Sequence, residues 1–600
     1  MNDSITRPMH TPASKNQHAN KSFWAFDSEF LQSGRVNRPE DVQTIQFSNG
    51  KDTVVLESPE QLKTWLHHHQ NIKTLYAFVL LPDLASIEEW LGNKHVNYKY
   101  RGGQLIGQIN YRGFHATCYD IRPMLVNFGL FRLEQCGQTV NMPKLQKPDW
   151  LGLRHWQNEQ EHADFVKYAG NDAVITSLIT KWLVSKFNAD PAKYASAGTL
   201  AKDEFALPKR LKRIKKTVTL SPLELAIKKI CYAGRSEAFV TGYVPNVIYN
   251  DIKSLYPVST AATKALQIIG AKQCEKDEVT ISNDTNDFGW VEGVFETNND
   301  IWGLPLRGKN NFYATGIIQG LYHSFDLAAA KVKVHHVTRA YKPVFSDDSK
   351  TQDKYTDMLL RRLENKMTDN EKMLAKAVLN SLTGKLGQSK PALAVTSNFF
   401  AYSTILAFSH AIVSKVFDMC PTPVLGCDTD SAFTQTDISG KKFEVNNMQA
   451  SNNTSHCSIP VIIDCKGKGD YVMFRSKTYL LKEQDKPITV YGRHGWQYFV
   501  EDYLKLFDGT ITELQTRQDI KHTLLTRQIE AQKLAKGRWR TKPVTLTLDR
   551  LENLLKADTK RNRDNYNSYE LVMQRKYETS RAWGFDQIMS LQENKLGYPN

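Results

Sequence analysis

Three carboxylates occur where strands are expected to end. Asp251 follows the apolar run Val247-Ile248-Tyr249, and Asp428 and Asp430 follow the run Val424-Leu425-Gly426-Cys427. Carboxylates at adjacent strand ends can converge on two divalent cations, which would clamp the attacking and leaving oxygens of a nucleotidyl transfer. The tripeptide Asp-Thr-Asp is weak evidence by itself, because acidic turns are common in a chain of this length.

A second acidic group lies near the N-terminus. Asp27 and Glu29 are spaced i, i+2 and therefore face one side of an expected strand. Tyr168 and Asp172 are spaced i, i+4 and face one side of an expected helix. Several carboxylates with a tyrosine that orients water could carry out two-metal hydrolysis. Each of these short spacings is unspecific when it stands alone.

Basic and amide side chains occur at helical spacing between Asp251 and Asp428. Lys372, Lys376 and Asn380 are spaced i, i+4, i+8 and share one helix face. Two ammonium groups on one face could cradle a triphosphate; the alternative is a solvated basic face. Further along, Lys477 and Tyr479 are spaced i, i+2 and lie on one side of an expected strand.

Local patterns predict the elements that must position these residues. A capping box with Pro at the first helical position begins a helix at Ser58. The other expected elements are a strand at 72–79, a long helix at 157–187, a strand that runs into a turn at 245–257, a helical hairpin at 353–386 and a β-hairpin at 423–435 with acidic residues at its tip.

Composition sets the class of protein. A chain of 600 residues exceeds one compact domain. The formal charge of +15 suits a polyanionic partner, although a basic but otherwise ordinary enzyme has the same balance. The eight cysteines form no CxxC pair, which argues against a zinc site. We expect a disordered polar tail at 1–20, no signal peptide and no membrane span.

Four stretches in order resemble the motifs of family B DNA polymerases. Asp251-Ile252-Lys253-Ser254-Leu255-Tyr256-Pro257 resembles motif A, DxxSLYP, and residues 376–384 resemble motif B, KxxxNSxYG. Cys427-Asp428-Thr429-Asp430-Ser431 is similar to motif C, and Lys477-Thr478-Tyr479 is similar to the KxY motif. Four motifs in the family's order leave little room for chance.

This resemblance implies a role for each motif residue. Asp251 and Asp430 would hold two Mg²⁺ or Mn²⁺ ions, with support from Asp428. Tyr256 would act as a steric gate against the ribose 2′-OH, which implies dNTP substrates. Lys372, Lys376 and Asn380 would bind the incoming nucleotide, and Lys477 and Tyr479 would contact DNA at the primer terminus. Motif B departs from the family pattern at Thr383, where a tyrosine is usual, so fidelity or dNTP affinity would differ.

The N-terminal acidic group resembles the proofreading exonuclease of the same family. Asp27 and Glu29 match its DxE motif, and the stretch from Tyr168 to Asp172 matches YxxxD. The middle motif matches only at Asp83, and its usual Asn is replaced by Val79, which would weaken proofreading. We expect the carboxylates of this group to bind metal, and they are Asp27, Glu29, Asp83 and Asp172. Asp120 is the alternative to Asp83.

The length resembles the protein-primed branch, found in bacteriophages and linear plasmids. Tyr232-Ala233-Gly234-Arg235 is similar to its YxGG/A linker motif, which implies DNA contacts by Tyr232 and Gly234. The stretch from Asp251 to Lys376 is long enough for an insertion that contacts a terminal protein. The stretch from Asn380 to Asp428 looks short for the second insertion, so high processivity is in doubt.

The expected fold is a multidomain one, α/β and α+β: an RNase H-like exonuclease followed by a right-hand polymerase. Its partners would be template and primer DNA, dNTPs and a separate terminal protein, in the cytoplasm of a bacterial host. The rivals are a primer-independent or repair-type polymerase, an exonuclease with a decayed polymerase site, and a non-catalytic DNA-binding scaffold. The expected boundaries are a tail at 1–20, exonuclease at 21–190, basic linker at 191–224, palm at 225–265 and 393–500, terminal-protein-type insertion at 266–350, fingers at 351–392 and thumb at 501–600.

Overall fold

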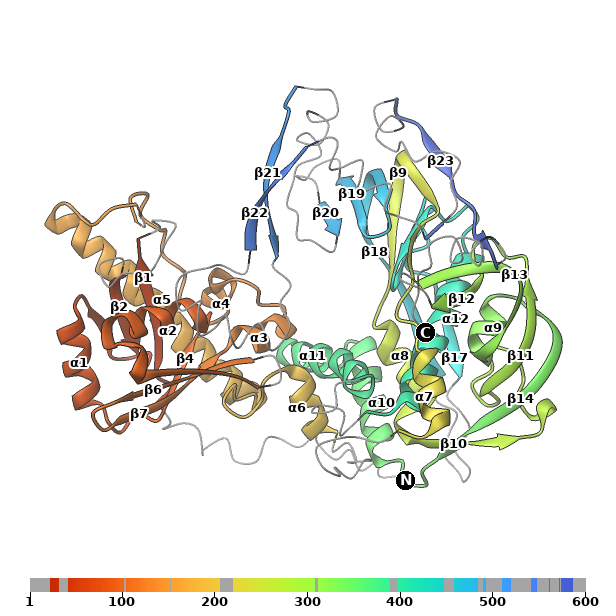
Figure 1. Cartoon of the computed structure of the whole chain (residues 1–600), viewed down its shortest axis with the longest axis horizontal. Helices are drawn as coiled ribbons and strands as arrows, with labels where there is room; N and C mark the ends of the chain where they lie inside the picture. The colour runs from red at the N-terminus through yellow and green to blue at the C-terminus, as the bar shows by residue number, and fades with distance from the viewer. Residues whose placement is uncertain are drawn as a thin grey trace, which may run out of the picture. The chain divides into compact units, whose positions relative to one another are not determined.

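A computed structural model gives the arrangement of most of the chain (Figure 1). It describes residues 22–31, 42–101, 104–151, 153–205, 220–307, 311–388, 397–446, 458–483, 489–492, 505, 510–519, 541–547, 560–561, 571, 574–585 and 587. The predicted tail at 1–20, the basic stretch 208–216 and most of the expected thumb lie outside these residues.

The chain divides into two compact units, which we describe one at a time. The first comprises Met1–Glu204, Met367–Ser381 and Asp519–Lys542. The second comprises Phe205–Lys366, Leu382–Gln518 and Pro543–Asn600.

A seven-stranded mixed sheet forms the centre of the first unit, in the order β3-β2-β1-β4-β7-β6-β5. Strand β4 runs parallel to its neighbours β1 and β7, and the other pairs are antiparallel. The strands are β1 Ala25–Phe30, β2 Val42–Ser48, β3 Thr53–Leu56, β4 Thr74–Ala77, β5 Val96–Arg101, β6 Gln104–Tyr111 and β7 Phe114–Asp120.

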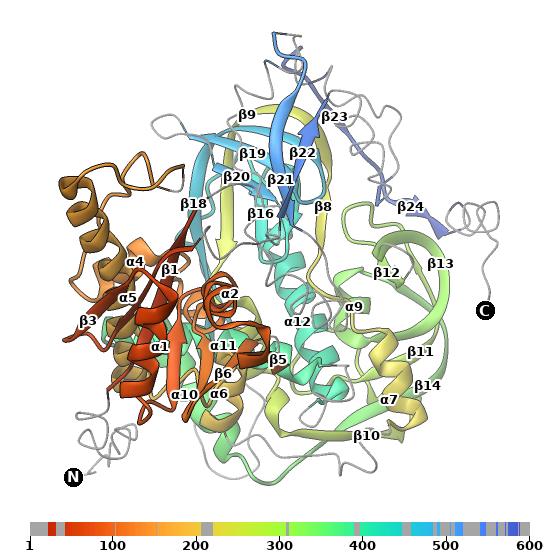
Figure 2. The same cartoon turned by 60° about the vertical axis from the view of Figure 1, so that its left-hand side comes forward.

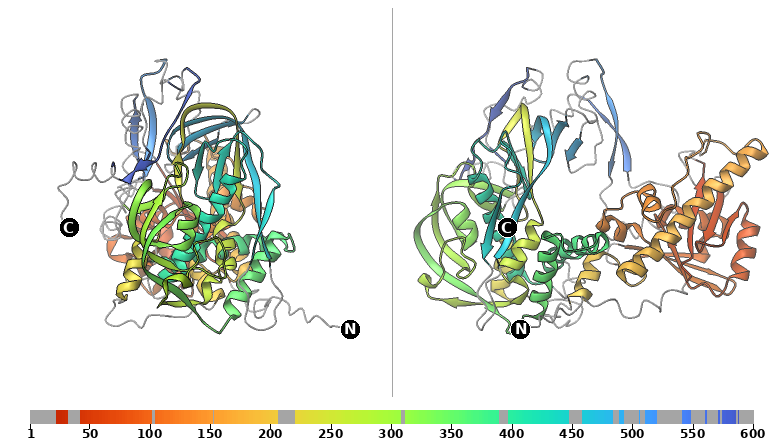
Figure 3. Two further views of the ribbon diagram at one scale, coloured as in Figure 1. Left: turned by 90° about the vertical axis from the view of Figure 1, so that its right-hand side faces the viewer. Right: turned by 180° about the vertical axis from the view of Figure 1, so that it is seen from behind.

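Helices cover both faces of this sheet. The long helix α5 runs along β1, β2 and β3 (Figure 3, right), and α2 also packs against β1. Since α5 meets the face that bears Asp27 whereas α2 meets the alternate residue Ser28, the two helices lie on opposite faces. The helices are α1 Pro59–His68, α2 Leu80–Leu91, α3 Arg122–Leu125, α4 Leu133–Thr139, α5 Glu159–Phe187 and α6 Ala197–Glu204.

The predicted helix starts in this unit are confirmed. The Ser58 hydroxyl accepts a hydrogen bond of 3.3 Å from the Gln61 amide, and Pro59 is the first residue of α1. The Asn158 side chain caps α5 in the same way through the Glu161 amide, at 2.8 Å. Such caps satisfy amides that have no partner within the first helical turn.

A nine-stranded sheet in the second unit carries Asp251 of motif A, the motif C hairpin and the KxY motif. Its main path is β20-β19-β18-β9-β16-β15-β8, with β17 paired to β18 and β23 paired to β9. Its core includes Val244, Phe433, Tyr471 and Leu481. The strands are β8 Ser236–Ala238, β9 Val240–Ile252, β15 Gly426–Asp428, β16 Ser431–Thr434, β17 Lys442–Asn446, β18 Ser458–Arg475, β19 Thr478–Glu483, β20 Thr489–Gly492 and β23 Tyr577–Thr579.

A second sheet of this unit is formed by the expected insertion. Its order is β10-β14-β11-β13-β12, with β24 paired to β13. A separate two-stranded sheet pairs β21 with β22. The strands are β10 Ile268–Cys274, β11 Trp290–Thr297, β12 Leu304–Arg307, β13 Asn311–His323, β14 Lys333–Phe345, β21 Leu514–Asp519, β22 Thr541–Leu546 and β24 Trp583–Gly584.

Helix α12 forms part of the core of the second unit. It packs against α7, α8 and α9, and most of its residues are buried. Within the part of the chain that the structure describes, it is the one helix long and apolar enough to cross a membrane. The remaining helices are α7 Pro222–Lys229, α8 Leu255–Ala262, α9 Ser324–Ala329, α10 Lys350–Leu363 and α12 Phe399–Asp418, together with α11 Asp369–Leu386, most of which belongs to the first unit.

The end of the chain returns to the sheets that precede it. Strand β23 adds to β9 of the nine-stranded sheet, and β24 adds to β13 of the insertion sheet (Figure 2). The stretch that we expect to be the thumb therefore also supplies strands to the central part of the second unit.

Candidate active sites

The end of β9 and the tip of the β15–β16 hairpin bring Asp251 and Asp430 together. Asp251 is in register with Ser431 on β16. The next amide, of Ile252, donates a hydrogen bond of 2.8 Å to the Asp430 carbonyl. Burial, followed by the negative charge of Asp251, raises the pKa of Asp430 to about 7. A pKa raised by burial and by a neighbouring negative charge means that the carboxylates lie close together. A divalent cation bound between them would neutralise their repulsion.

Asp428 lies at the other side of the same turn and meets the KxY residues. The Lys477 ammonium lies 3.6 Å from Asp428 Oδ1, and the Tyr479 hydroxyl donates a hydrogen bond of 3.3 Å to Oδ2. Tyr479 is fully buried. The two side chains therefore converge on one carboxylate, and their contact with a primer terminus stays a prediction.

The turn between the two aspartates has a strained centre and a fixed base. Thr429 has a φ of 63°, in the left-handed region that favours glycine. Its amide donates a hydrogen bond of 2.7 Å to the carbonyl of Arg235, and Asp428 pairs in register with Ser236. The predicted linker motif is thus attached to the backbone of motif C.

Tyr256 lies on the first turn of α8, against the linker motif. Motif A was expected to end in a turn, but Ser254, with a φ of 56°, reverses the chain so sharply that the helix begins at Leu255. Burial and then the neighbouring Tyr402 raise the pKa of Tyr256. A Cβ added to Gly234 would lie 2.7 Å from the Tyr256 hydroxyl and 2.5 Å from Thr429 Cγ2. A methyl group at this position would therefore force these two side chains to shift.

Strand β18 adds charged residues that the sequence analysis missed. Asp464 is directly opposite Asp251 in the sheet register. Lys466 Nζ lies 3.2 Å from Asp251 Oδ2, and Lys253 Nζ lies 3.1 Å from Asp464 Oδ1. No local pattern marks these residues, because only the pairing of β18 with β9 brings them to the site.

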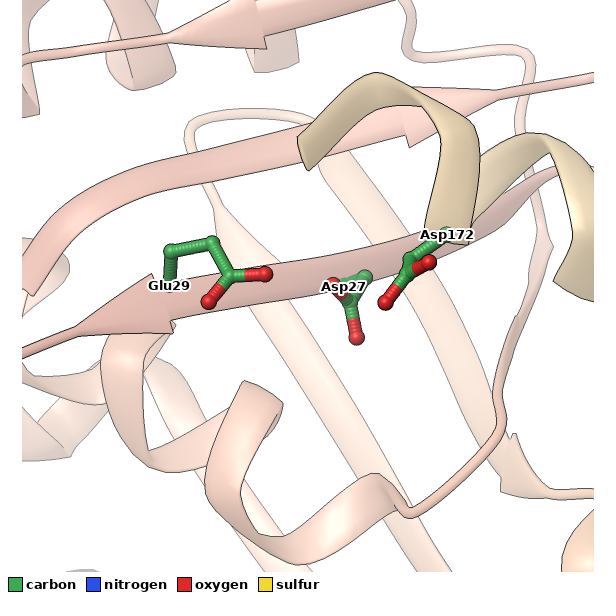
Figure 4. Close-up of side chains that lie close together, drawn as sticks. All are labelled: Asp27, Glu29 and Asp172. Carbon is green, nitrogen blue, oxygen red and sulfur yellow. The ribbon is translucent and has the colours of Figure 1, made fainter. Parts of the chain in front are cut away.

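Asp27, Glu29 and Asp172 meet in the first unit (Figure 4). One carboxylate oxygen from each lies within 4.8 Å of the others. Burial and then the charge of Asp172 raise the pKa of Asp27 to about 7, while burial and then Asp27 raise the pKa of Glu29. Asp172 Oδ1 is buried and accepts no hydrogen bond from any described residue. Crowded, unsatisfied carboxylate oxygens fit a hard divalent cation.

Two further side chains complete this group and were not predicted. Lys144 forms an ion pair with Asp172, and its ammonium lies 5.5 Å from the centre of the Tyr168 ring. The Gln46 amide donates a hydrogen bond of 2.8 Å to Asp27 Oδ2. Tyr168 itself is buried, one helical turn before Asp172. Lys144 and Gln46 come from other elements, so spacing along the sequence gave no signal for them.

Asp83 and Asp120 lie outside the group of three. Asp83 is buried on α2 and accepts a hydrogen bond of 3.0 Å from the Ser28 hydroxyl. Burial and then the charge of Asp27 raise its pKa, which places Asp83 in the electrostatic field of the site. Asp120 is also buried and accepts a hydrogen bond of 3.1 Å from the Arg122 amide. Metal ligation by Asp83 stays a prediction.

Comparisons with known proteins find a family resemblance for part of the chain. Residues 155–395 match the family model described as DNA polymerase type B, organellar and viral. The matched stretch includes the residues of motifs A and B and resembles that family there. No curated protein matches it closely enough in sequence to count as a relative.

Solved structures of the phi29 DNA polymerase share the fold of this chain. The complex with primer-template DNA and incoming nucleotide substrates has a TM-score of 0.57 at 15% identity, and the match covers 88% of this chain and 100% of that one. The complex with single-stranded DNA has a TM-score of 0.55 at 16% identity, with 84% and 97% covered. Together with the organellar and viral family model, this confirms the expected resemblance to the protein-primed branch.

The motif B residues lie on α11, as predicted. Lys376 and Asn380 are exposed, and Lys372 is half-buried with its ammonium 3.7 Å from Asp369. Thr383 is buried, and its hydroxyl has no hydrogen-bond partner among the described residues. Since Lys372–Asn380 belong to the first unit and Asp251 to the second, the contact of this helix with a nucleotide stays a prediction.

Proposed function

We propose that this chain is a type B DNA polymerase that extends a DNA primer from its 3′-OH with dNTPs, as directed by a template. The observation that supports this most strongly is the convergence of Asp251 and Asp430 beside Tyr256. Asp430 is crowded enough by Asp251 that its pKa is raised to about 7. Hard carboxylate oxygens of this kind suit Mg²⁺ or Mn²⁺.

Each protein group has a stated role in the proposed reaction. Asp251 and Asp430 would hold two cations, which would activate the 3′-OH and neutralise the developing phosphate charge. Asp428, fixed by Lys477 and Tyr479, supports the turn. Lys376 and Lys372 stabilise charge on the triphosphate as pyrophosphate leaves. Positioning and electrostatics carry most of the catalysis.

Tyr256 and Asn380 complete the proposed nucleotide site. Tyr256 excludes the ribose 2′-OH, so deoxynucleotides are the substrates. Its hydroxyl is held close to the Gly234 backbone, as the short distance to a Cβ added there indicates. Tyr232 and Gly234 contact the template strand.

We also propose a 3′→5′ exonuclease in the first unit. Asp27, Glu29 and Asp172 bind two cations, with Asp83 as a further ligand. Tyr168 orients the water that attacks the terminal phosphodiester. The grouping of the three carboxylates within 4.8 Å supports the hydrolytic site. Val79, in place of the family's Asn, weakens the grip on a frayed strand.

The biological setting follows from the resemblance. We propose that the chain replicates a phage, plasmid or mobile-element genome from a terminal protein, in the cytoplasm of a bacterial host. The domain assignment that we propose is exonuclease 21–190, linker 191–224, palm 225–265 and 393–500, terminal-protein insertion 266–350, fingers 351–392 and thumb 501–600.

Single-nucleotide incorporation tests the polymerase proposal. A primer is incubated with one template base presented next, Mg²⁺ and each dNTP or rNTP in turn, in an exonuclease-inactive background (Asp27→Ala with Glu29→Ala). We expect only the complementary dNTP to be added. The exposed Asp418, on α12 of the same unit, gives the matched control Asp418→Ala, which should extend normally.

Equal addition of all four dNTPs would contradict template direction, and equal use of rNTPs would contradict the role of Tyr256. Omitting the DNA primer separates the rival polymerase types: synthesis on a bare template would favour a primer-independent enzyme. Transfer of a first dNMP to a protein hydroxyl would support protein priming.

A further inference from the structure

A buried charge cluster lies next to the turn that carries Asp428 and Asp430. Arg235 Nη2 donates a hydrogen bond of 2.6 Å to Glu237 Oε2, and Arg561 Nη1 donates one of 3.3 Å to the same oxygen. All three side chains are 1% exposed. Burial of ions is unfavourable unless they are well paired, so such a cluster points to a specific positional requirement.

Arg561 joins three parts of the second unit at this cluster. Its Nε donates a hydrogen bond of 2.9 Å to the Ser580 hydroxyl. Its Nη2 donates to the carbonyls of Ser580 at 3.0 Å and Asp300 at 3.1 Å. The C-terminal segment, the insertion and the nine-stranded sheet are thereby fixed to one guanidinium.

Arg235 depends on this arrangement for its own position. Its guanidinium carbon lies 4.0 Å from the centre of the Tyr313 ring and 4.6 Å from that of Trp302. Its Nε and Nη1 have no hydrogen-bond partner among the described residues. Stacking and the single carboxylate of Glu237 therefore hold the side chain in place.

The backbone of Arg235 and Ser236 supports the proposed polymerase site. The Arg235 carbonyl accepts the Thr429 amide at 2.7 Å. The Ser236 carbonyl accepts the hydroxyl of Ser476, the neighbour of Lys477, at 2.6 Å. It also accepts the ammonium of Lys560, the neighbour of Arg561, at 2.9 Å. A shift of this strand would displace both the aspartate turn and Lys477.

We propose that Arg561 is a positioning residue for the polymerase site, acting through Glu237 and Arg235 on the turn from Asp428 to Asp430. This inference rests on the proposed function. It assigns the C-terminal segment a part in nucleotidyl transfer and none in the hydrolysis carried out by the first unit.

The variant Arg561→Met probes this role with limited damage to the fold. Arg235 remains to neutralise Glu237, so no buried carboxylate is left unpaired. The hydrogen bonds to Ser580 and Asp300 are lost, and the strand from Arg235 to Glu237 loses its outer support. Displacement of catalytic groups by about 1 Å can lower a rate by about a hundredfold.

The test compares Arg561→Met, Arg561→Lys and the control Arg581→Met, an exposed arginine of the same segment. Measurements are kcat and KM for the complementary dNTP, the half-saturating Mg²⁺ concentration, primer-template affinity and degradation of single-stranded DNA. For Arg561→Met we expect kcat to fall about tenfold to a hundredfold and the half-saturating Mg²⁺ concentration to rise. KM, DNA affinity and degradation should stay within about twofold of wild type. A change that affects only how groups are positioned in the transition state leaves the binding of dNTP and DNA intact. Arg561→Lys should recover part of kcat, and Arg581→Met should match wild type.

Two results would overturn the inference while leaving the proposed function intact. One is wild-type kcat in Arg561→Met. The other is that Arg561→Met loses kcat, DNA affinity and the unfolding transition in calorimetry together, which would make Arg561 a residue of general stability. Failure of the wild-type enzyme to extend a primer would instead overturn the proposed function, and this inference with it.

Discussion

Gly234 and Tyr256 lie so close that a methyl group on Gly234 would meet the tyrosine hydroxyl at 2.7 Å. Strands β8 and β9 separate the linker motif from motif A in the sequence, yet the two motifs share this contact at the site that we propose for the incoming nucleotide. The same methyl group would meet Thr429 of motif C at 2.5 Å. Residues of three motifs therefore meet at this glycine.

The substitution Gly234→Ala should displace Tyr256 and Thr429. Forcing a methyl group into a packed site destabilises proteins by about 1–3 kcal/mol. We expect primer extension to fall by about tenfold or more, while degradation of single-stranded DNA stays unchanged. The control is Gly270→Ala, because a Cβ at Gly270 meets no atom within 4 Å. Normal extension by Gly234→Ala would show that the two side chains move aside freely.

The stability of the metal-free protein should depend on pH through Asp430. Its pKa is about 7 in the folded protein and 3.8 ordinarily, so folding takes up a proton between these values. The contribution of Asp430 to the free energy of unfolding is therefore largest below about pH 3.8 and is lost as the pH rises through 7. In EDTA, the Tm of wild type should drop more from pH 5 to pH 8 than the Tm of Asp430→Asn.

Asp437→Asn is the control for that experiment. Hydrogen bonds from Lys468 and Ser439 lower the pKa of Asp437 to about 2, so its charge is constant between pH 5 and 8. Its pH profile should parallel that of wild type. A profile for Asp430→Asn that is as steep as wild type would show that the proton is taken up elsewhere, for instance at Asp27, whose pKa is also raised to about 7.

Lys466 should compete with a cation for Asp251. Its ammonium lies 3.2 Å from Asp251 Oδ2 and its side chain is 48% exposed. Exposed ion pairs contribute about 0.2–1 kcal/mol, which corresponds to roughly a 1.5- to 5-fold change in affinity. We expect Lys466→Met to lower the half-saturating Mg²⁺ concentration for extension by that factor. Lys468→Met, two residues along the same strand and paired with Asp437, should leave it unchanged. A higher Mg²⁺ requirement in Lys466→Met would assign Lys466 to substrate binding.

Asp83 can be tested as a metal ligand by a substitution that keeps its shape. Asn at this position still accepts the hydrogen bond from Ser28, so packing on α2 is preserved. If Asp83 binds a cation, Asp83→Asn should slow degradation by about tenfold or more, with extension unaffected. Asp120→Asn should degrade DNA normally, since the Asp120 carboxylate accepts the Arg122 amide. Normal degradation by Asp83→Asn would leave Asp83 with a structural role only.

Local spacing predicted the parts of both sites that single elements carry. Asp27 and Glu29 share a face of β1 because side chains alternate along a strand, and Tyr168 and Asp172 share a face of α5. The hairpin that carries Asp428 and Asp430 was predicted from an apolar run followed by an acidic turn.

The residues that sequence analysis missed are joined to the sites by long-range pairing. Lys466 reaches Asp251 only through the register of β18 against β9, and Lys144 reaches Asp172 from outside any regular element. Arg561 pairs with Glu237 across most of the chain. A single sequence contains no periodic signal for such contacts, since they depend on the tertiary fold.

The central claim is tested most directly by one experiment on a 5′-labelled primer annealed to a longer template, with Mg²⁺ and with or without dNTPs. The panel is wild type, Asp251→Ala, and Asp27→Ala with Glu29→Ala; Asp164→Ala, an exposed aspartate of α5, is the control. We predict that Asp251→Ala still shortens the primer but never lengthens it, whereas the double variant lengthens it and no longer shortens it. Extension by Asp251→Ala at the wild-type rate, or no extension by folded wild type that still degrades DNA, would contradict the assignment of the polymerase site.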